Sequence, residues 1–341
     1  YTKAITLKPD YAEAHNNLGV TLKEQGRLDE AEESCRQAIT LKPDYAEAHG
    51  NLGVILKELG RLKDAEASYR KAITLKPDYA EAHGNLGVIL KELGRLKEAE
   101  ASLRQAITLK PDYAKAHYNL GVMLKDLGRL KEAEVSYRQA IKLKSDFAEA
   151  HNNLGNTLKD LGKLKEAETS YRHVITLKPD YAKAHNNLGV MLQELERLKE
   201  AEVSYRQAIK LKPDYAKAHN NLGIILKELG KLDQAETSMR QAIALKPDYA
   251  EAHNNLGVIL KEQGILKEAY SAFIQAINLN PDFTDAYGNL GIVIKNVRFN
   301  SSNVKLYPVL IQLLSNGNFA RPMDLAPSIL SLLKHDPLIK N

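Results

Sequence analysis

The sequence contains no tryptophan and a single cysteine, Cys35, among its 341 residues. One thiol cannot form an internal disulfide or a cysteine-rich metal site, and such sparse use of cysteine suits a reducing cytoplasm. No apolar run approaches the roughly 20 residues that a membrane-spanning helix needs, and no secretory signal peptide opens the chain. We therefore expect a cytoplasmic protein with no membrane partner.

Neither sign of charge dominates the chain. There are 48 lysines and arginines against 43 acidic residues, and the two signs alternate along the sequence. Nucleic-acid-binding domains usually concentrate basic residues on one face, so we expect no nucleic-acid partner. Apolar residues make up 44% of the chain, which is enough to build a core.

A repeat of 34 residues organises most of the chain. The motif Tyr-Ala-Glu/Lys-Ala-His begins at Tyr11, Tyr45, Tyr79, Tyr113, Phe147, Tyr181, Tyr215 and Tyr249, and a looser copy begins at Phe283. Residues 1–10 match the end of a repeat, 11–282 form eight complete repeats, and 283–296 form the first helix of a ninth. Because the chain starts inside a repeat and without methionine, we interpret it as part of a longer protein.

Each repeat is predicted to form two helices. In the second repeat, apolar or small residues recur with helical spacing over 46–59 and again over 62–75. Gly60 lies between them and suits a left-handed turn, while Pro77 ends the second helix. Asp78 could cap the helix that follows. No segment shows a strand pattern, so we predict an all-α fold.

The order of residues within each repeat is specific. In the second repeat the signature residues are His49, Leu52, Gly53, Leu56, Ala65, Tyr69, Ala72 and Pro77. This pattern resembles the tetratricopeptide repeat, although His replaces the usual Trp and Leu the usual Tyr. The resemblance covers residues 1–296 and implies a right-handed α-solenoid, or superhelix, of helix-turn-helix repeats that binds proteins or peptides.

Several repeats depart from the pattern. Glu196 stands where other repeats have the turn glycine, at a cost of about 1 kcal/mol if the backbone there is left-handed. Cys35, Leu103 and Met239 replace the aromatic residue of the second helix, and Cys35 is expected to be a buried thiol. The repeats at 45–78 and 79–112 differ at only three positions, which suggests recent duplication or a designed consensus.

The resemblance implies that the first helix of each repeat lines a concave groove. We number positions from the residue after the aromatic that opens the repeat. Positions 2, 5, 6, 9, 12 and 13 then fall within a sector of about 120°, opposite the packing stripe. We therefore expect function at these positions.

Position 6 is asparagine in every repeat. The row consists of Asn17, Asn51, Asn85, Asn119, Asn153, Asn187, Asn221, Asn255 and Asn289. An amide can both donate to and accept from the backbone of an extended peptide. The row resembles the asparagine ladder of O-GlcNAc transferases, which implies peptide binding. The alternative is that each amide bonds the neighbouring helix and only orders the stack.

Positions 9 and 2 supply further candidates for the groove. Position 9 is mostly valine or isoleucine, and Val122, Asn156 and Val190 lie in the middle of the chain, where they could contact a bound peptide or be partly buried. Position 2 becomes basic at Lys115, Lys183 and Lys217, which favours an acidic ligand there. Lysines at position 12 and acids at position 13 are expected to neutralise one another.

The sequence contains no arrangement of residues typical of a catalytic or metal-binding site. Position 4 carries a row of histidines, but neighbours stand a whole repeat apart, too far to share one metal ion, so we expect structural histidines. Acidic pairs recur in every repeat as surface charges, and no phosphate loop or nucleophile motif is present. We therefore predict no catalytic residue, no metal and no cofactor in this chain. The two-carboxylate clamp that binds chaperone tails is also unsupported, because position 5 is never lysine.

After residue 296 the periodicity fails. Residues 297–306 form a polar break, and two short helices at 308–314 and 325–333 would serve as a divergent cap or as a connector. We predict a scaffold that binds extended protein segments through the asparagine row. The alternatives are a substrate-recruiting arm of a larger bacterial glycosyltransferase or SAM-dependent methyltransferase, and a passive spacer. End-to-end self-association is also plausible through the uncapped first repeat.

Overall fold

The computed structural model describes residues 1–295, 306–315 and 322–336, and these residues form helices and no strand. The first helices of the repeats are α2 (Ala12–Glu24), α4 (Ala46–Glu58), α6 (Ala80–Glu92), α8 (Ala114–Asp126), α10 (Ala148–Asp160), α12 (Ala182–Glu194), α14 (Ala216–Glu228), α16 (Ala250–Glu262) and α18 (Thr284–Ile294). The second helices are α3 (Leu28–Leu41), α5 (Leu62–Leu75), α7 (Leu96–Leu109), α9 (Leu130–Leu143), α11 (Leu164–Leu177), α13 (Leu198–Leu211), α15 (Leu232–Leu245) and α17 (Leu266–Leu279). The remaining helices are α1 (Thr2–Leu7), α19 (Tyr307–Ser315) and α20 (Pro322–Leu333). None of the described helices is both long and apolar enough to cross a membrane.

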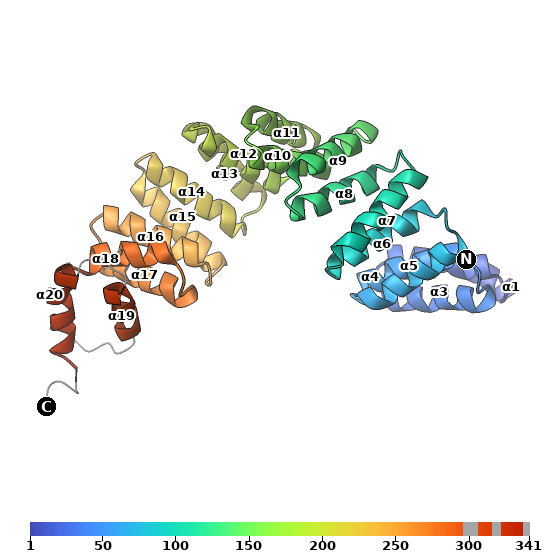
Figure 1. Cartoon of the computed structure of the whole chain (residues 1–341), viewed down its shortest axis with the longest axis horizontal. Coiled ribbons are helices and arrows are strands. Elements are labelled where there is room, and N and C mark those ends of the chain that lie inside the picture. Colours follow the sequence, from blue (N-terminus) through green and yellow to red (C-terminus); the bar gives the residue numbers. More distant parts are fainter. Residues whose placement is uncertain (296–305, 316–321, 337–341) are drawn as a thin grey trace. The chain divides into compact units, whose positions relative to one another are not determined.

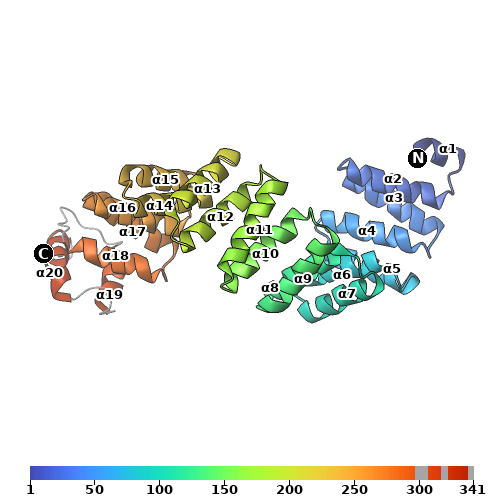
Figure 2. The same cartoon turned by 90° about the horizontal axis from the view of Figure 1, so that it is seen from above.

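The chain divides into two compact blocks, Tyr1–Leu177 and Lys178–Asn341. Within each block the two helices of a repeat pack against each other, and the second helix also packs against the first helix of the next repeat (Figure 1). In the second block, α18 lies beside α16 and α17, continuing the stack (Figure 2). This arrangement confirms the predicted α-solenoid of helix-turn-helix repeats within each block.

The turns between the helices depend on the backbone conformations that their residues can adopt. Seven turn glycines, Gly60 among them, have φ between 73° and 80°, the left-handed region that glycine adopts at little cost. Glu196 adopts the same turn with φ 57°, which confirms the predicted strained position. The predicted aspartate cap is wrong. Asp78 lies one residue before the N-cap of α6, so it is not in the capping position. The N-cap is Tyr79, and its side chain makes no capping bond.

Replacing Glu196 with glycine is expected to stabilise the second block by about 1 kcal/mol, because a left-handed non-glycine residue costs about that much. Urea denaturation would measure the change. The matched reverse substitution, Gly230→Glu, lies at the same turn of the next repeat, where φ is 73°, and should destabilise by a similar amount. If both variants had the same free energy of unfolding as the wild type, the strain argument would be contradicted.

The core of each repeat is built on close approach of its two helices. At Gly53, an added Cβ would lie 2.7 Å from Cε1 of Tyr69, whose ring is only 1% exposed. Ala65 and Ala72 on the second helix are fully buried. Cys35 occupies the place of the aromatic ring and is buried as predicted, and burial raises the pKa of its thiol to about 12. The small residues therefore serve packing, as the sequence indicates.

Helices α19 and α20 pack against the end of the second block. The Ser328 hydroxyl donates to the carbonyl oxygen of Ile294 at 2.6 Å, and the Tyr287 hydroxyl donates to Gln312 Oε1 at 3.1 Å. These bonds connect both helices to α18, and the first satisfies a carbonyl at its C-terminus. That they cap the array stays a prediction. Apart from Leu306, the polar break predicted at 297–306 lies outside the described residues.

Candidate functional site

The first helices of each block form a continuous face. Neighbouring first helices contact one another directly, as α4 contacts α6 and α14 contacts α16. We call the residues at positions 2, 6, 9, 12 and 13 of these helices the inner face. Including position 5 in the groove was wrong. Asn16 and Asn220 are 4% and 5% exposed, because the aromatic residue that opens the next repeat covers this position.

The asparagine row has a structural role at most of its positions. The side-chain amide of position 6 donates to position 5 of the preceding repeat, as from Asn51 to Asn16 Oδ1 at 2.9 Å and from Asn255 to Asn220 Oδ1 at 3.1 Å. Asn153, Asn221 and Asn289 make the same kind of bond. Asn187 also has a partner. The stack-ordering alternative therefore accounts for one donor of these amides.

Asn17 belongs to the first repeat and has no position-5 residue before it, and two further asparagines of the row stand apart. Asn85 and Asn119 follow repeats in which position 5 is glycine, Gly50 and Gly84, so the acceptor that the other amides use is missing. Neither side chain has a hydrogen-bond partner within the described residues, and both are half-buried on the inner face. A half-buried amide without a partner can offer both its donors and its acceptor to another backbone.

Apart from the exposed Ile292, the apolar row at position 9 lies half-buried beside the amides. Val122 and Val190 are both partly accessible, whereas Asn156 accepts a hydrogen bond from the Tyr171 hydroxyl at 2.7 Å. Ile224 and Val258 line a small cavity of about 100 Å³, together with Lys227, Met239, Asn255 and Ile259. Met239 replaces the aromatic ring of other repeats, and its slender side chain leaves this space open on the inner face.

The charges at positions 12 and 13 neutralise one another, as predicted. Lysine at position 12 pairs with the acid at position 13 of the next repeat, as between Lys57 and Glu92 at 3.2 Å and between Lys91 and Asp126 at 2.7 Å. Gln193 keeps the contact with a neutral donor and bonds Glu228 at 3.3 Å. These pairs leave little net charge along this edge of the inner face.

Position 2 behaves differently in acidic and in basic repeats. Where it is glutamate and the residue 29 places later is lysine, the two can pair, as between Glu47 and Lys76 at 2.9 Å. The hydrogen bond from Lys76 lowers the pKa of the Glu47 carboxyl group. Where position 2 is lysine, the residue 29 places on is also lysine. The resulting lysine pairs are Lys115 with Lys144, Lys183 with Lys212, and Lys217 with Lys246.

All six of these lysines are exposed, and no ion pair forms on any of them within the part of the chain that the structure describes. Lys144, Lys212 and Lys246 lie over the aromatic ring that opens the next repeat, with Nζ between 5.0 and 5.6 Å from its centroid. A cation over a ring keeps its full charge. Each place therefore presents two positive charges where acidic repeats present a neutral pair.

The histidine row ties each repeat to the loop before it. Nε2 lies 3.0 Å from a loop carbonyl oxygen at His83 and His253, where the acceptors are Pro77 and Pro247. The same contact recurs at the other position-4 histidines. A histidine that donates to a loop carbonyl has a structural role, as predicted.

Comparison with known families agrees with this architecture. A family model described as TPR repeat matches residues 87–127, 121–162, 155–196, 191–230 and 225–264. Models described as tetratricopeptide repeat match residues 10–78, 68–101 and 250–283. The chain belongs to the tetratricopeptide repeat family. No curated protein matches its sequence.

Solved tetratricopeptide repeat structures resemble the chain. The crystal structure of the APC/C hetero-tetramer Cut9-Hcn1 is 17% identical, with a TM-score of 0.60, over 84% of this chain and 56% of that one. PilF of Pseudomonas aeruginosa is 21% identical, with a TM-score of 0.55, over 61% of this chain and 94% of that one. These likenesses show the fold alone, and the chain spans just over half of the first structure. As a tetratricopeptide repeat protein, it is a protein-interaction scaffold.

Sequence reasoning missed the second lysine of each basic pair. The loop lysines Lys144, Lys212 and Lys246 look alike in every repeat, and only the structure shows that they face position 2. The constant spacing of 29 residues between position 2 and the loop lysine was the available signal. It also missed Tyr118, whose ring lies 4.8 Å from that of Phe147 and whose hydroxyl accepts the bond from Asn153.

Proposed function

We propose that, within each block, the inner face of this tetratricopeptide repeat scaffold binds an extended, acidic segment of a partner protein. The observation that carries this proposal is the set of three lysine pairs at position 2, which no carboxylate of the described chain neutralises. Two lysines that face each other without a counter-charge repel, and an acidic side chain between them would relieve that repulsion.

In each block, other residues of the inner face suit the remaining parts of an extended chain bound there. The amides of Asn85 and Asn119 are available to its backbone N–H and C=O groups, and Asn119 lies about one helical turn after Lys115 on α8. In the second block, the cavity of about 100 Å³ beside Ile224 and Val258 has room for a small aliphatic side chain. Backbone capture gives affinity without demanding a sequence, and the lysine pairs supply the charge preference.

Changing the three position-2 lysines to glutamate is expected to lower affinity for acidic peptides by about tenfold or more, since each exposed charge contact contributes up to about 1 kcal/mol. The variant is Lys115→Glu, Lys183→Glu and Lys217→Glu. It converts each basic repeat to the acidic kind, which pairs as Glu47 does with Lys76, so folding should be kept. Fluorescence anisotropy with a labelled pool of randomised Asp/Glu-, Val- and Ser-containing peptides would measure the loss.

The matched control makes the same change of net charge elsewhere. Lys131→Glu, Lys199→Glu and Lys267→Glu alter exposed lysines at one shared position of the second helices. This control should bind the acidic pool like the wild type, and raising the salt should weaken the wild type toward the inner-face variant. Equal losses in both variants would reduce the effect to net charge alone. If the wild type binds no pool, acidic or basic, the passive-spacer alternative gains support.

A further inference from the structure

A second kind of pocket recurs on the opposite side of the repeats. It opens between the second helices of two consecutive repeats, above the first helix that separates them. Between α9 and α11 the cavity has a volume of about 390 Å³, and Arg138, His151, Ser170 and His173 are among its lining residues. This pocket lies entirely within the first block.

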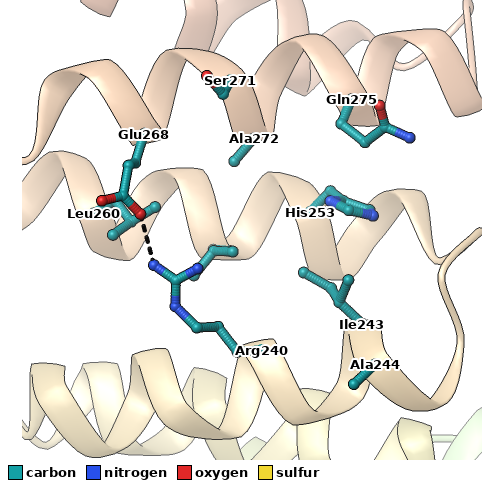
Figure 3. A pocket seen from close by; sticks show the side chains of 10 residues that line it. Arg240, Ile243, Ala244, His253, Leu260, Glu268, Ser271, Ala272 and Gln275 are labelled. Carbon is teal, nitrogen blue, oxygen red and sulfur yellow. Dashed lines mark hydrogen bonds and ion pairs between the residues drawn. The ribbon is translucent and has the colours of Figure 1, made fainter.

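Of the four equivalent pockets in the described repeats, this is the one that contains two histidines. The rings of His151 and His173 lie with their centroids 4.4 Å apart. His151 belongs to the structural row, but the position of His173 is glutamine or lysine in every other complete repeat, namely Gln37, Lys71, Gln105, Gln139, Gln207, Gln241 and Gln275. Figure 3 shows the equivalent pocket of the second block, where Gln275 stands across from His253.

The hydrogen bond of His151 prepares it to act as a ligand. Its Nε2 lies 3.0 Å from the carbonyl oxygen of Ser145, an acceptor, so Nε2 carries the proton and Nδ1 carries the lone pair. Metal-binding histidines commonly donate their other ring N–H to a backbone carbonyl, which fixes the tautomer and makes the ligand nitrogen more basic. His173 is exposed, so its ring can rotate toward a shared ion.

The charges around the pair allow a cation to approach. The Arg138 guanidinium is paired with Glu134 at 3.0 Å and with Glu166 at 2.6 Å. Lys142 at the rim is exposed to solvent. Burial and the neighbouring His173 lower the pKa of His151.

We propose that His151 and His173 together bind one divalent transition-metal ion of the class that prefers imidazole, such as Zn²⁺, Ni²⁺ or Cu²⁺. In such a site both ring nitrogens would lie about 2 Å from the ion and about 3.3 Å from each other, and the ring centroids lie 4.4 Å apart without the ion. Water completes the coordination, since the described residues hold no cluster of three or more His, Cys, Asp or Glu.

Calorimetric titration of the full chain with ZnCl2 tests the site, and the repeats supply the controls. His173→Gln installs the residue of the sister pockets and is expected to weaken Zn²⁺ binding at least tenfold without altering the circular dichroism spectrum. Gln275→His should create a second site, because His253 Nε2 lies 3.0 Å from the Pro247 carbonyl oxygen and Arg240 pairs with Glu268, as in the first pocket. The stoichiometry should then rise from one ion to two.

Two further readings separate this site from adventitious binding. Affinity for Zn²⁺ should fall as pH drops, because protons compete for the same nitrogens. Electron paramagnetic resonance of the Cu²⁺-loaded protein should show two equatorial nitrogens in the wild type and one in His173→Gln. If His173→Gln binds like the wild type, or Gln275→His leaves the stoichiometry unchanged, the proposal is overturned.

Discussion

Gly257→Ala is expected to destabilise the α16–α17 pair by about 2 kcal/mol, the cost of forcing an extra methyl group into a well-packed core. The added Cβ would lie 2.5 Å from Cε1 of Phe273, and this ring is fully buried. A rigid ring cannot bend away, so the two helices must separate. Hydrogen exchange of the amides in α16 and α17 would measure the loss, because stability in a repeat array is largely local.

The preceding repeat offers a matched control with the same backbone. At Gly223 the new Cβ would lie 2.7 Å from Cε of Met239, the far end of a flexible side chain, 3.1 Å from Cγ of the same residue and 3.2 Å from the Ala235 carbonyl oxygen. Methionine can change rotamer and move aside, so Gly223→Ala should cost less than about 1 kcal/mol. The cavity of about 100 Å³ beside Met239 gives it somewhere to go. Equal protection factors in the two variants would show that the glycine serves something other than ring packing.

The fold could be predicted because every complete repeat carries the same sequence pattern. Periodic apolar residues set the helices, and a left-handed residue, usually glycine, ends each first helix. The stop signal at Lys-Pro-Asp then separates one repeat from the next. Even the exception at Glu196 followed from its place in the pattern, and its φ of 57° confirms it. The aspartate cap failed because a cap depends on one residue of register, which periodicity does not determine.

The inner face was harder to predict than the fold. The helical-wheel sector included position 5, but a wheel treats the helix as isolated and takes no account of the next repeat, whose aromatic residue buries that position, as Tyr79 does at Gly50. The asparagines looked identical in sequence. Their differences come from the residue at position 5 of the preceding repeat, a contact between side chains 35 residues apart.

Asparagines with and without a position-5 partner should therefore differ in what they contribute, the first to stability and the second to binding. Asn85→Ala with Asn119→Ala is expected to lower affinity for the acidic peptide pool by about tenfold, since each amide would lose hydrogen bonds that contribute about 0.5–1.5 kcal/mol apiece. Stability should hardly change, because neither amide bonds another described residue. Anisotropy titration gives the affinity, and urea denaturation gives the free energy of unfolding.

Asn221→Ala with Asn255→Ala is the complementary pair. These amides donate at 3.1 Å to Asn186 Oδ1 and to Asn220 Oδ1, and both acceptors are at least 95% buried. Removing the donors leaves buried oxygens unsatisfied, so the second block should lose about 1 kcal/mol or more for each substitution. A loss of affinity in the first pair without a loss of stability would assign Asn85 and Asn119 to the ligand. Unchanged affinity in the first pair would leave the asparagine row as a structural ladder, and the lysine pairs alone would then have to account for any binding on this face.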